Sequence, residues 1–283
     1  MAFEARRLLD WTFEPVRQSY RERDAILYAL GVGLPDDPLN AGELEFLLED
    51  RLKVLPTFAV TLSTPGMWVK APALEIDWVR LLHAAQAATF HRHLPSKAEI
   101  IGHARIKSVY DRGREKGAVV VVERQIFDAS SEVRYCTIEQ TLILRGNGGF
   151  GGEAPPRIDL PKPPQRQPDR RSETQTLARA ALIYRLSGDL NPLHADPVVA
   201  KRAGFERPIL HGLASYGIAG AQLLKLFAGN DPARLRSLSM RFAGVVLPGD
   251  TLDFSFWEDG ETVIFEARAG NRTVLDQGLA RIE

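Results

Sequence analysis

A segment rich in glycine and proline, residues 146–171, divides this chain into two parts and limits the folds that it can adopt. The segment contains five glycines before residue 153 and six prolines after residue 154. Such a composition packs poorly into a core and favours extended backbone. We therefore expect residues 146–171 to be a linker between a first half, residues 1–145, and a second half, residues 172–283.

The two halves have similar patterns, which indicates a diverged internal repeat. In the second half a helix-like segment, residues 209–227, precedes strand-like runs at 252–257, 263–267 and 274–282. Asp259 and Gly260 form a hairpin turn signal between the first two runs. A helix packed against several antiparallel strands buries the apolar face of each element, so the pattern predicts an α+β fold.

In the first half, an apolar run at residues 55–62 stands where the second half has its helix-like segment, and strand-like runs follow at 100–109, 119–127 and 133–144, with β-branched residues concentrated at 119–122. Residues 76–92 fit two alternatives. Their Leu and Ala content favours a helix, whereas their place in the repeat favours a strand.

The charge balance argues against a nucleic-acid-binding protein. The 36 Lys and Arg residues equal the 36 Asp and Glu residues, whereas nucleic-acid binding needs a basic surplus. The single cysteine, Cys136, cannot form an internal disulfide, which favours a reducing, cytoplasmic compartment. The first 15 residues are charged throughout, and no apolar run reaches the ~20 residues that span a bilayer. We therefore expect neither a secretion signal nor a membrane partner.

Residues 187–194, S-G-D-L-N-P-L-H, carry the side chains best suited to move protons near neutral pH. Asp189 and His194 are five positions apart, and the Asn191-Pro192 turn lets both face one point. An imidazole titrates near ~6.5 and can act as acid or base, and a nearby carboxylate favours its protonated form. The alternative is a purely structural role, with Asp189 capping a helix and His194 on the surface. The run of Ser, Gly, Asp, Asn, Pro and His within eight residues favours an acid/base site.

A second feature lies about 20 residues further on, where Gly212, Gly217 and Gly220 occupy a segment otherwise suited to a helix. Interior glycines weaken a helix by ~1 kcal/mol each, so they indicate close approach of a sheet or a ligand. Tight packing is the simpler explanation for Gly217 and Gly220. Gly212 stands at the first turn, where free N–H groups can stabilise a developing oxyanion.

Several other matches do not have the context that their chemistry requires. The Gly146-x-Gly148-x-x-Gly151 pattern fits a dinucleotide fingerprint but leads into the linker and not into a helix. His91 and His93 lack accompanying carboxylate or cysteine ligands, so no metal site is expected there. Ser215 and Cys136 suit packing roles better than nucleophilic ones.

Residues 184–196, followed by Ala203-Gly204-Phe205 and the P-I-L-H-G of residues 208–212, resemble the hydratase 2 motif of the MaoC-like, (R)-specific enoyl-CoA hydratases. The similarity extends over nearly the whole chain and is greatest to the hydratase domain of peroxisomal multifunctional enzyme type 2. The resemblance implies a double hot-dog fold, in which a curved antiparallel sheet wraps around a central helix in each half. It also implies an inactive first half, a catalytic second half, and reversible addition of water to trans-2-enoyl-CoA without a metal or redox cofactor.

The same resemblance implies roles for individual residues. Asp189 and His194 become the catalytic pair, Asn191 orients the site, and the Gly212 N–H polarises the thioester carbonyl. Four weaker assignments concern substrate binding, and in one of them the sequence departs from the family, because Ala84 and Ala85 replace a Gly-Glu pair. These substrate-binding assignments are His83, Ala84, Arg112, which sits where a basic residue would meet a CoA phosphate, and Phe242.

Two other functions fit the motif. One is dehydration of 3-hydroxyacyl groups on an acyl-carrier protein, and the other is a non-catalytic module that binds acyl-CoA. Because the first half lacks the Asp-x-Asn-Pro-x-His motif, we expect it to shape an acyl tunnel for medium to long or branched chains. A homodimer of such two-half chains is also compatible with the resemblance.

Overall fold

Ten antiparallel strands form one continuous sheet in the part of the chain that the computed structural model describes, residues 3–157 and 162–283. They are Val16–Tyr20 (β1), Leu81–Phe90 (β2), Ala98–Asp111 (β3), Ala118–Asp128 (β4), Arg134–Leu144 (β5), Arg170–Gln175 (β6), Leu235–Phe242 (β7), Thr251–Asp259 (β8), Thr262–Ala269 (β9) and Arg272–Ile282 (β10). Their order across the sheet is β1-β3-β4-β5-β2-β7-β10-β9-β8-β6.

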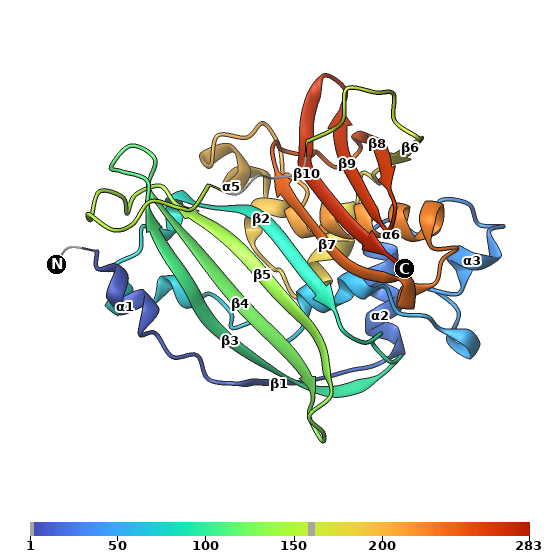
Figure 1. Cartoon of the computed structure of the whole chain (residues 1–283), viewed down its shortest axis with the longest axis horizontal. Helices are drawn as coiled ribbons and strands as arrows, with labels where there is room; N and C mark the ends of the chain where they lie inside the picture. Colours follow the sequence, from blue (N-terminus) through green and yellow to red (C-terminus); the bar gives the residue numbers. More distant parts are fainter. Residues whose placement is uncertain (1–2, 158–161) are drawn as a thin grey trace.

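This order repeats when it is read outward from the centre in either direction. β2 and β7 are neighbours, and each begins a set of five strands with the same internal order, which confirms the predicted repeat. Residues 85–89 of β2 pair with residues 237–241 of β7. Figure 1 shows the two sets of strands meeting at this seam, with helices packed against the sheet.

The longest helix of the described residues, α6 at Gly212–Phe227, is the central helix of the second half. Every residue from Ala214 to Leu224 is buried, so the helix is enclosed around its whole circumference, as a core helix is. The other helices are shorter. They are α1 (Ala5–Leu9), α2 (Glu22–Gly31), α3 (Ala41–Leu44), α4 (Ala180–Tyr184), α5 (Pro197–Arg202) and the 3-10 helices η1 (Glu49–Arg51), η2 (Pro56–Thr61), η3 (Trp68–Lys70), η4 (Pro72–Leu74), η5 (Trp78–Arg80), η6 (Arg185–Ser187), η7 (Pro192–His194) and η8 (Pro232–Arg234).

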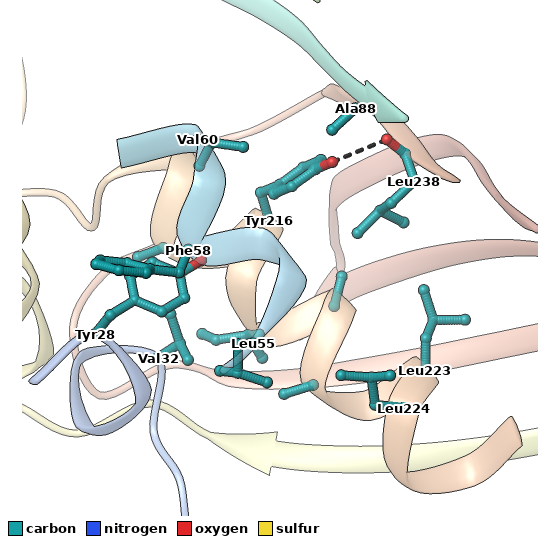
Figure 2. Close-up of a cluster of buried hydrophobic side chains, with 14 of the residues drawn as sticks. Tyr28, Val32, Leu55, Phe58, Val60, Ala88, Tyr216, Leu223, Leu224 and Leu238 are labelled. Atoms are coloured by element: carbon teal, nitrogen blue, oxygen red, sulfur yellow. Dashed lines mark hydrogen bonds between the residues drawn. The ribbon is translucent and has the colours of Figure 1, made fainter. Parts of the chain in front are cut away.

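The hydrophobic core joins the two halves across the seam. Tyr216 of α6 lies between η2 and the seam strands, and its hydroxyl donates a 2.9 Å hydrogen bond to the Leu238 carbonyl (Figure 2). Tyr28 and Phe58 of the first half belong to the same cluster, with ring centroids 5.3 Å apart. The start of α6 is therefore held in place by residues from both halves.

The glycines inside α6 are packing glycines, as the sequence predicts for two of them. A Cβ at Gly217 would lie 2.4 Å from Val32 Cγ1 and 2.6 Å from Tyr28 Oη. A Cβ at Gly220 would lie 2.5 Å from Cγ2 of Thr57. Real Cβ atoms do not approach so closely, so these two positions let first-half residues press against the helix.

Two sequence expectations concern the first half. At residues 55–62, which stand in the helix position of the repeat, Pro56–Thr61 forms the 3-10 helix η2, and its first five residues are all buried. A segment surrounded by the core on all sides lacks the alternation of a half-exposed strand. The ambiguous residues 76–92 contain η5 and then β2, whose burial alternates along most of its length.

The sequence did not predict β1, β6 or β7. β6 begins at Arg170, so the last two residues of the expected linker already pair with β8. The division into residues 1–145, 146–171 and 172–283 remains a prediction. Among the described helices, none has both the length and the apolar character to cross a bilayer.

Candidate active site

The loop between α4 and α5 carries the Asp-x-Asn-Pro-x-His motif and is shaped by its own side chains. Gly188 has φ of 112°, a conformation that favours glycine, and turns the chain before Asp189. The Asp189 carboxylate accepts a hydrogen bond from the Asn191 N–H at 3.1 Å. The Asn191 side chain accepts another from the Leu193 N–H at 3.1 Å and so caps η7, the helical turn that ends at His194. Asn191 therefore shapes the backbone that joins Asp189 to His194.

His194 is held with one ring nitrogen free. Its Nδ1 lies 2.9 Å from the Ile209 carbonyl oxygen, which can only accept, so Nδ1 carries the proton. Nε2 is then the unprotonated atom, suited to accept a proton. Burial lowers the pKa of His194 below 6.5, while the Ile209 hydrogen bond and Asp189 act in the opposite direction. The neutral form of this ring is therefore favoured near pH 7.

The structure brings the carboxylate of Asp189 close to the His194 ring, as the sequence predicts. One ligand atom from each of Asp189, His194 and His211 lies within 4.8 Å of the other two. Asp189 is exposed, whereas both histidines are buried. A water molecule at the exposed side of this group can reach the carboxylate and an imidazole together.

His211 is the site residue that sequence reasoning missed. Its ring stacks on His194 with centroids 3.7 Å apart, and its Nε2 donates to the Asp189 carbonyl oxygen at 3.1 Å. The opposite neighbour is Tyr184, at a ring distance of 4.9 Å. Burial, followed by the neighbouring His194, lowers the pKa of His211 to about 4. His211 therefore fixes both the Asp189 loop and the face of the His194 ring while remaining uncharged.

His211 belongs to the P-I-L-H-G stretch of the family motif, and a second sequence signal for it is its position. It is the N-cap of α6, where Ser, Thr, Asp or Asn is preferred, and its side chain makes no capping hydrogen bond. A residue that is unusual for a cap and stands directly before a helix is a candidate for another role.

The start of α6 has free N–H donors directly after His211. Within the described residues, no hydrogen bond uses the N–H of Gly212 or Leu213 as its donor, whereas Ala214 already donates to the His211 carbonyl at 3.0 Å. A Cβ at Gly212 would lie 3.5 Å from the Phe242 ring, an ordinary contact distance. Unlike Gly217 and Gly220, Gly212 is therefore not required by close packing, which leaves its N–H group as the feature to explain.

His83 and Phe242 meet at the same place from the two seam strands. Their ring centroids are 5.0 Å apart in an edge-to-face arrangement. His83 Nε2 donates to the Ala85 carbonyl at 3.1 Å, and burial lowers the pKa of His83 to about 4. Asp189 is among the charges that act on His83, although burial is the main cause of its shift.

The remaining two substrate-binding assignments are less close to the motif. Ala84 is buried beside a bulge in the β2–β5 pairing and offers a methyl group without polar atoms. Arg112 is exposed in the turn between β3 and β4. Arg112 follows β3, at the same end of the strands as His83. Since β4 and β5 lie between β3 and β2, the structure does not bring Arg112 to Asp189 and His194. The roles of all eight predicted site residues remain predictions.

The glycine pattern at residues 146–151 has a structural role. The Asp111 carboxylate accepts hydrogen bonds from the N–H groups of Gly149 and Gly151, each at 2.7 Å. These bonds lower the pKa of Asp111, Gly149 contributing most. The backbone donors that would hold a phosphate in a dinucleotide site are occupied, which agrees with rejecting that match.

Asp189, His194 and His211 also form the one cluster with metal-ligand chemistry among the described residues. One nitrogen of each ring already donates to a backbone carbonyl, which leaves one nitrogen per ring and the carboxylate. The expectation of catalysis without a metal or redox cofactor remains a prediction.

Two family models match the chain and together cover both halves. The MaoC like domain matches residues 159–278, and the MFE-2 hydratase 2 N-terminal domain matches residues 18–146. The boundary between the models lies inside the glycine- and proline-rich segment.

Curated relatives match over nearly the whole chain. "Enoyl-CoA hydratase 2, peroxisomal" from Arabidopsis thaliana is 38% identical over 291 residues, covering 96% of this chain and 94% of the relative. "3-hydroxyacyl-thioester dehydratase Y" from Mycobacterium tuberculosis is 38% identical over 277 residues, covering 94% of this chain and 93% of the relative.

Solved structures agree. A MaoC-like dehydratase from Phytophthora capsici has a TM-score of 0.86 at 30% identity and covers 98% of both chains. A conserved hypothetical protein from Mycobacterium tuberculosis, described as having a double hotdog fold, has a TM-score of 0.58 at 14% identity and covers 96% of both chains. The chain therefore belongs to the MaoC-like, hydratase 2 family of hydro-lyases and has the double hot-dog fold.

Proposed function

We propose that this protein catalyses the reversible addition of water to a trans-2-enoyl-CoA, giving the (3R)-3-hydroxyacyl-CoA. The observation that carries the proposal is the cluster of Asp189, the neutral His194 ring and His211, whose ligand atoms lie within 4.8 Å of one another. Gly212, with its unpaired N–H, directly follows His211 in the chain. The hydratase names of the relatives agree with the reaction class.

The geometry supports a separate role for each of His194, Asp189 and Gly212. Nε2 of His194 accepts a proton from a water molecule that also hydrogen-bonds to Asp189, and the water oxygen forms a bond to C3 of the substrate. The electron pair of the C2–C3 π bond moves toward the thioester carbonyl, where the Gly212 N–H stabilises the enolate oxygen. The His194 imidazolium then gives its proton to C2. One water molecule has been added, and both side chains return to their starting state.

Asp189 has two functions in this scheme. It positions the water, and its negative charge favours the transient imidazolium of His194. His211 holds the Asp189 backbone through its 3.1 Å hydrogen bond and does not itself exchange protons in the cycle. The (3R) configuration of the product follows from the family resemblance, and chiral analysis of the product tests it directly.

The substrate-binding residues complete the proposal. The His83 and Phe242 rings line the site beside Gly212, where the thioester has to lie. Arg112 is exposed at the same end of the sheet, in reach of an extended nucleotide end of CoA and not of the reacting carbons. The first half, which lacks the motif, would accommodate medium to long or branched acyl chains.

A second candidate reaction is supported by the relative from Mycobacterium tuberculosis that is named a 3-hydroxyacyl-thioester dehydratase. The chemistry is the reverse of the same cycle, and the difference lies in the carrier of the acyl group. Comparison of kcat/KM for matched CoA and acyl-carrier-protein thioesters separates the two reactions. A non-catalytic binding module would bind acyl-CoA without changing the absorbance of the enoyl band.

The experiment that tests the proposal is a panel of trans-2-enoyl-CoA substrates of increasing length, followed by chiral analysis of the products. We expect loss of the enoyl absorbance, formation of the (3R) alcohol and a preference for chains longer than crotonyl. No turnover of any enoyl-CoA, or a (3S) product, would contradict the proposal. The cytoplasmic compartment and the homodimer remain sequence-based predictions, and the relative from Arabidopsis thaliana has a peroxisomal name.

A further inference from the structure

A cavity lies at the far end of the β2–β7 seam from the candidate active site. Its volume is about 400 Å³, within the range of small-molecule sites. Phe90 at the end of β2 and Leu235 at the start of β7 form part of its wall, together with Pro56 at the start of η2. The catalytic loop and Gly212 do not line it.

The register of the seam relates this cavity to the active site. Residues 85–89 pair with residues 237–241, so the central pair is Ala87 and Ser239. A rotation by 180° about this central pair would superpose β2 on β7. Phe90 lies three residues after Ala87, and Phe242 lies three residues after Ser239, so the rotation places Phe90 where Phe242 stands. The cavity therefore occupies the place in the first half that the candidate active site occupies in the second.

The side chains lining this cavity are basic and not catalytic. His91, Arg92, His93 and Arg236 line it, and no Asp or Glu is among its described lining residues. Within the described contacts Arg92 has no ion pair, whereas Arg236 has one with Glu283 at 2.7 Å. Burial and the nearby Arg134 both lower the pKa of His91, in keeping with a positive potential at this end of the seam.

The remaining wall is apolar and partly aromatic. Phe90, Leu235 and Tyr135 are buried, and the rest of the apolar lining is Pro56, Pro95, Pro232 and Ala233. A ligand that fills the cavity therefore needs a negatively charged group and a flat or apolar body. Two guanidinium groups with imidazole donors suit a phosphate dianion better than a single carboxylate, because arginine binds phosphate oxygens through paired N–H groups.

We propose that this cavity binds an organic phosphate of the nucleoside monophosphate class, with its phosphate between Arg92 and Arg236 and its ring against the apolar wall. Under this proposal, the end of the seam at Phe242 carries the hydration reaction, and the equivalent end at Phe90 binds an anion. The site is separate from the proposed hydration, and its occupancy does not require turnover.

Binding of adenosine 5′-monophosphate to the full chain, measured by calorimetry, tests the proposal. We expect Arg92→Gln to weaken binding at least about tenfold, because glutamine cannot make the charge-assisted hydrogen bond that Arg92 would donate to the phosphate. Arg236→Gln should weaken it in the same direction. Arg112→Gln is the matched control, because Arg112 is an exposed arginine assigned to the other site. Hydratase activity should be unchanged in Arg92→Gln.

Loss of binding in Arg92→Gln with normal binding in Arg112→Gln supports the site. Equal binding by Arg92→Gln and the unaltered protein, loss in Arg112→Gln alone, or no binding by the unaltered protein would overturn it. A parallel titration with inorganic phosphate distinguishes the sources. Weaker binding than the nucleotide supports the organic ligand, whereas binding as tight as the nucleotide would refute a role for the apolar wall.

Discussion

Replacement of Gly212 by alanine separates the catalytic use of the α6 amino end from its packing. Gly212 has no left-handed backbone angle, and an added Cβ would lie 3.5 Å from the Phe242 ring, so the methyl group fits. Alanine is the better helix former by up to about 1 kcal/mol. We therefore expect the stability of Gly212→Ala to be unchanged or slightly raised, with a Tm increase of no more than about 3 °C.

The activity of Gly212→Ala should change in the opposite direction. The methyl group fills the space between the helix start and the Phe242 ring, where the thioester oxygen has to approach the free N–H. Removal of one oxyanion donor lowers kcat by about 10²-fold in well-studied enzymes. We expect a loss of that size in the hydration of an enoyl-CoA, measured from the decay of the enoyl absorbance together with a thermal unfolding curve.

Gly217→Ala is the matched control, five residues along the same helix. Its Cβ would lie 2.4 Å from Val32 Cγ1, so we expect overpacking to reduce stability by about 1–3 kcal/mol. Kinetics close to normal in Gly212→Ala, with the expected stability, would refute the role of its N–H group. A large loss of stability in Gly212→Ala would show that the glycine is there for packing.

The other predictions concern the histidines of the site. Burial lowers the pKa of His194, and the neutral ring is the base, so kcat/KM should remain high as pH falls to 6.5 and should decline below that pH. A decline that begins above pH 7 in the pH–rate profile would contradict this role. The pKa values of His83 and His211 fall to about 4 on folding, so the unfolded chain binds protons first between pH 6.5 and 4. Urea unfolding should therefore show a falling free energy of unfolding as pH drops through this window, and a constant value would be evidence against buried neutral rings. His211→Phe keeps an aromatic neighbour for His194 but loses the donor to the Asp189 carbonyl, so kcat should fall about tenfold with little change in KM. His211→Gln retains a donor and should recover part of the rate, and failure of both variants to alter kcat would rule out a positioning role for His211.

The sequence predicts the motif geometry well because that geometry is local. Gly188, Asn191 and the Asx-type hydrogen bonds between them act over a few residues, so their pattern is visible in the chain. The long helix α6 is also predictable from its small and apolar composition. The two-half architecture follows from the repeat of strands on each side of the linker.

Other parts depend on tertiary packing that no short window reveals. η2 is a short apolar segment, and its burial on every side allows a proline-initiated 3-10 turn. β7 was missed although it forms the centre of the sheet, because residues 235–242 mix apolar, Ser and Arg residues and are stabilised by β2 and β10 on both sides. His211 meets His194 across 17 residues of chain, and the basic cavity joins segments far apart in sequence.

The most direct test of the central claim is the turnover of Asp189→Asn and His194→Ala in the hydration of trans-2-enoyl-CoA. If these two groups hold and deprotonate one water molecule, each substitution should lower kcat by about 10²-fold or more while the folded structure is retained, since general acid/base groups contribute on this scale. Near-normal kcat in either folded variant would contradict the claim.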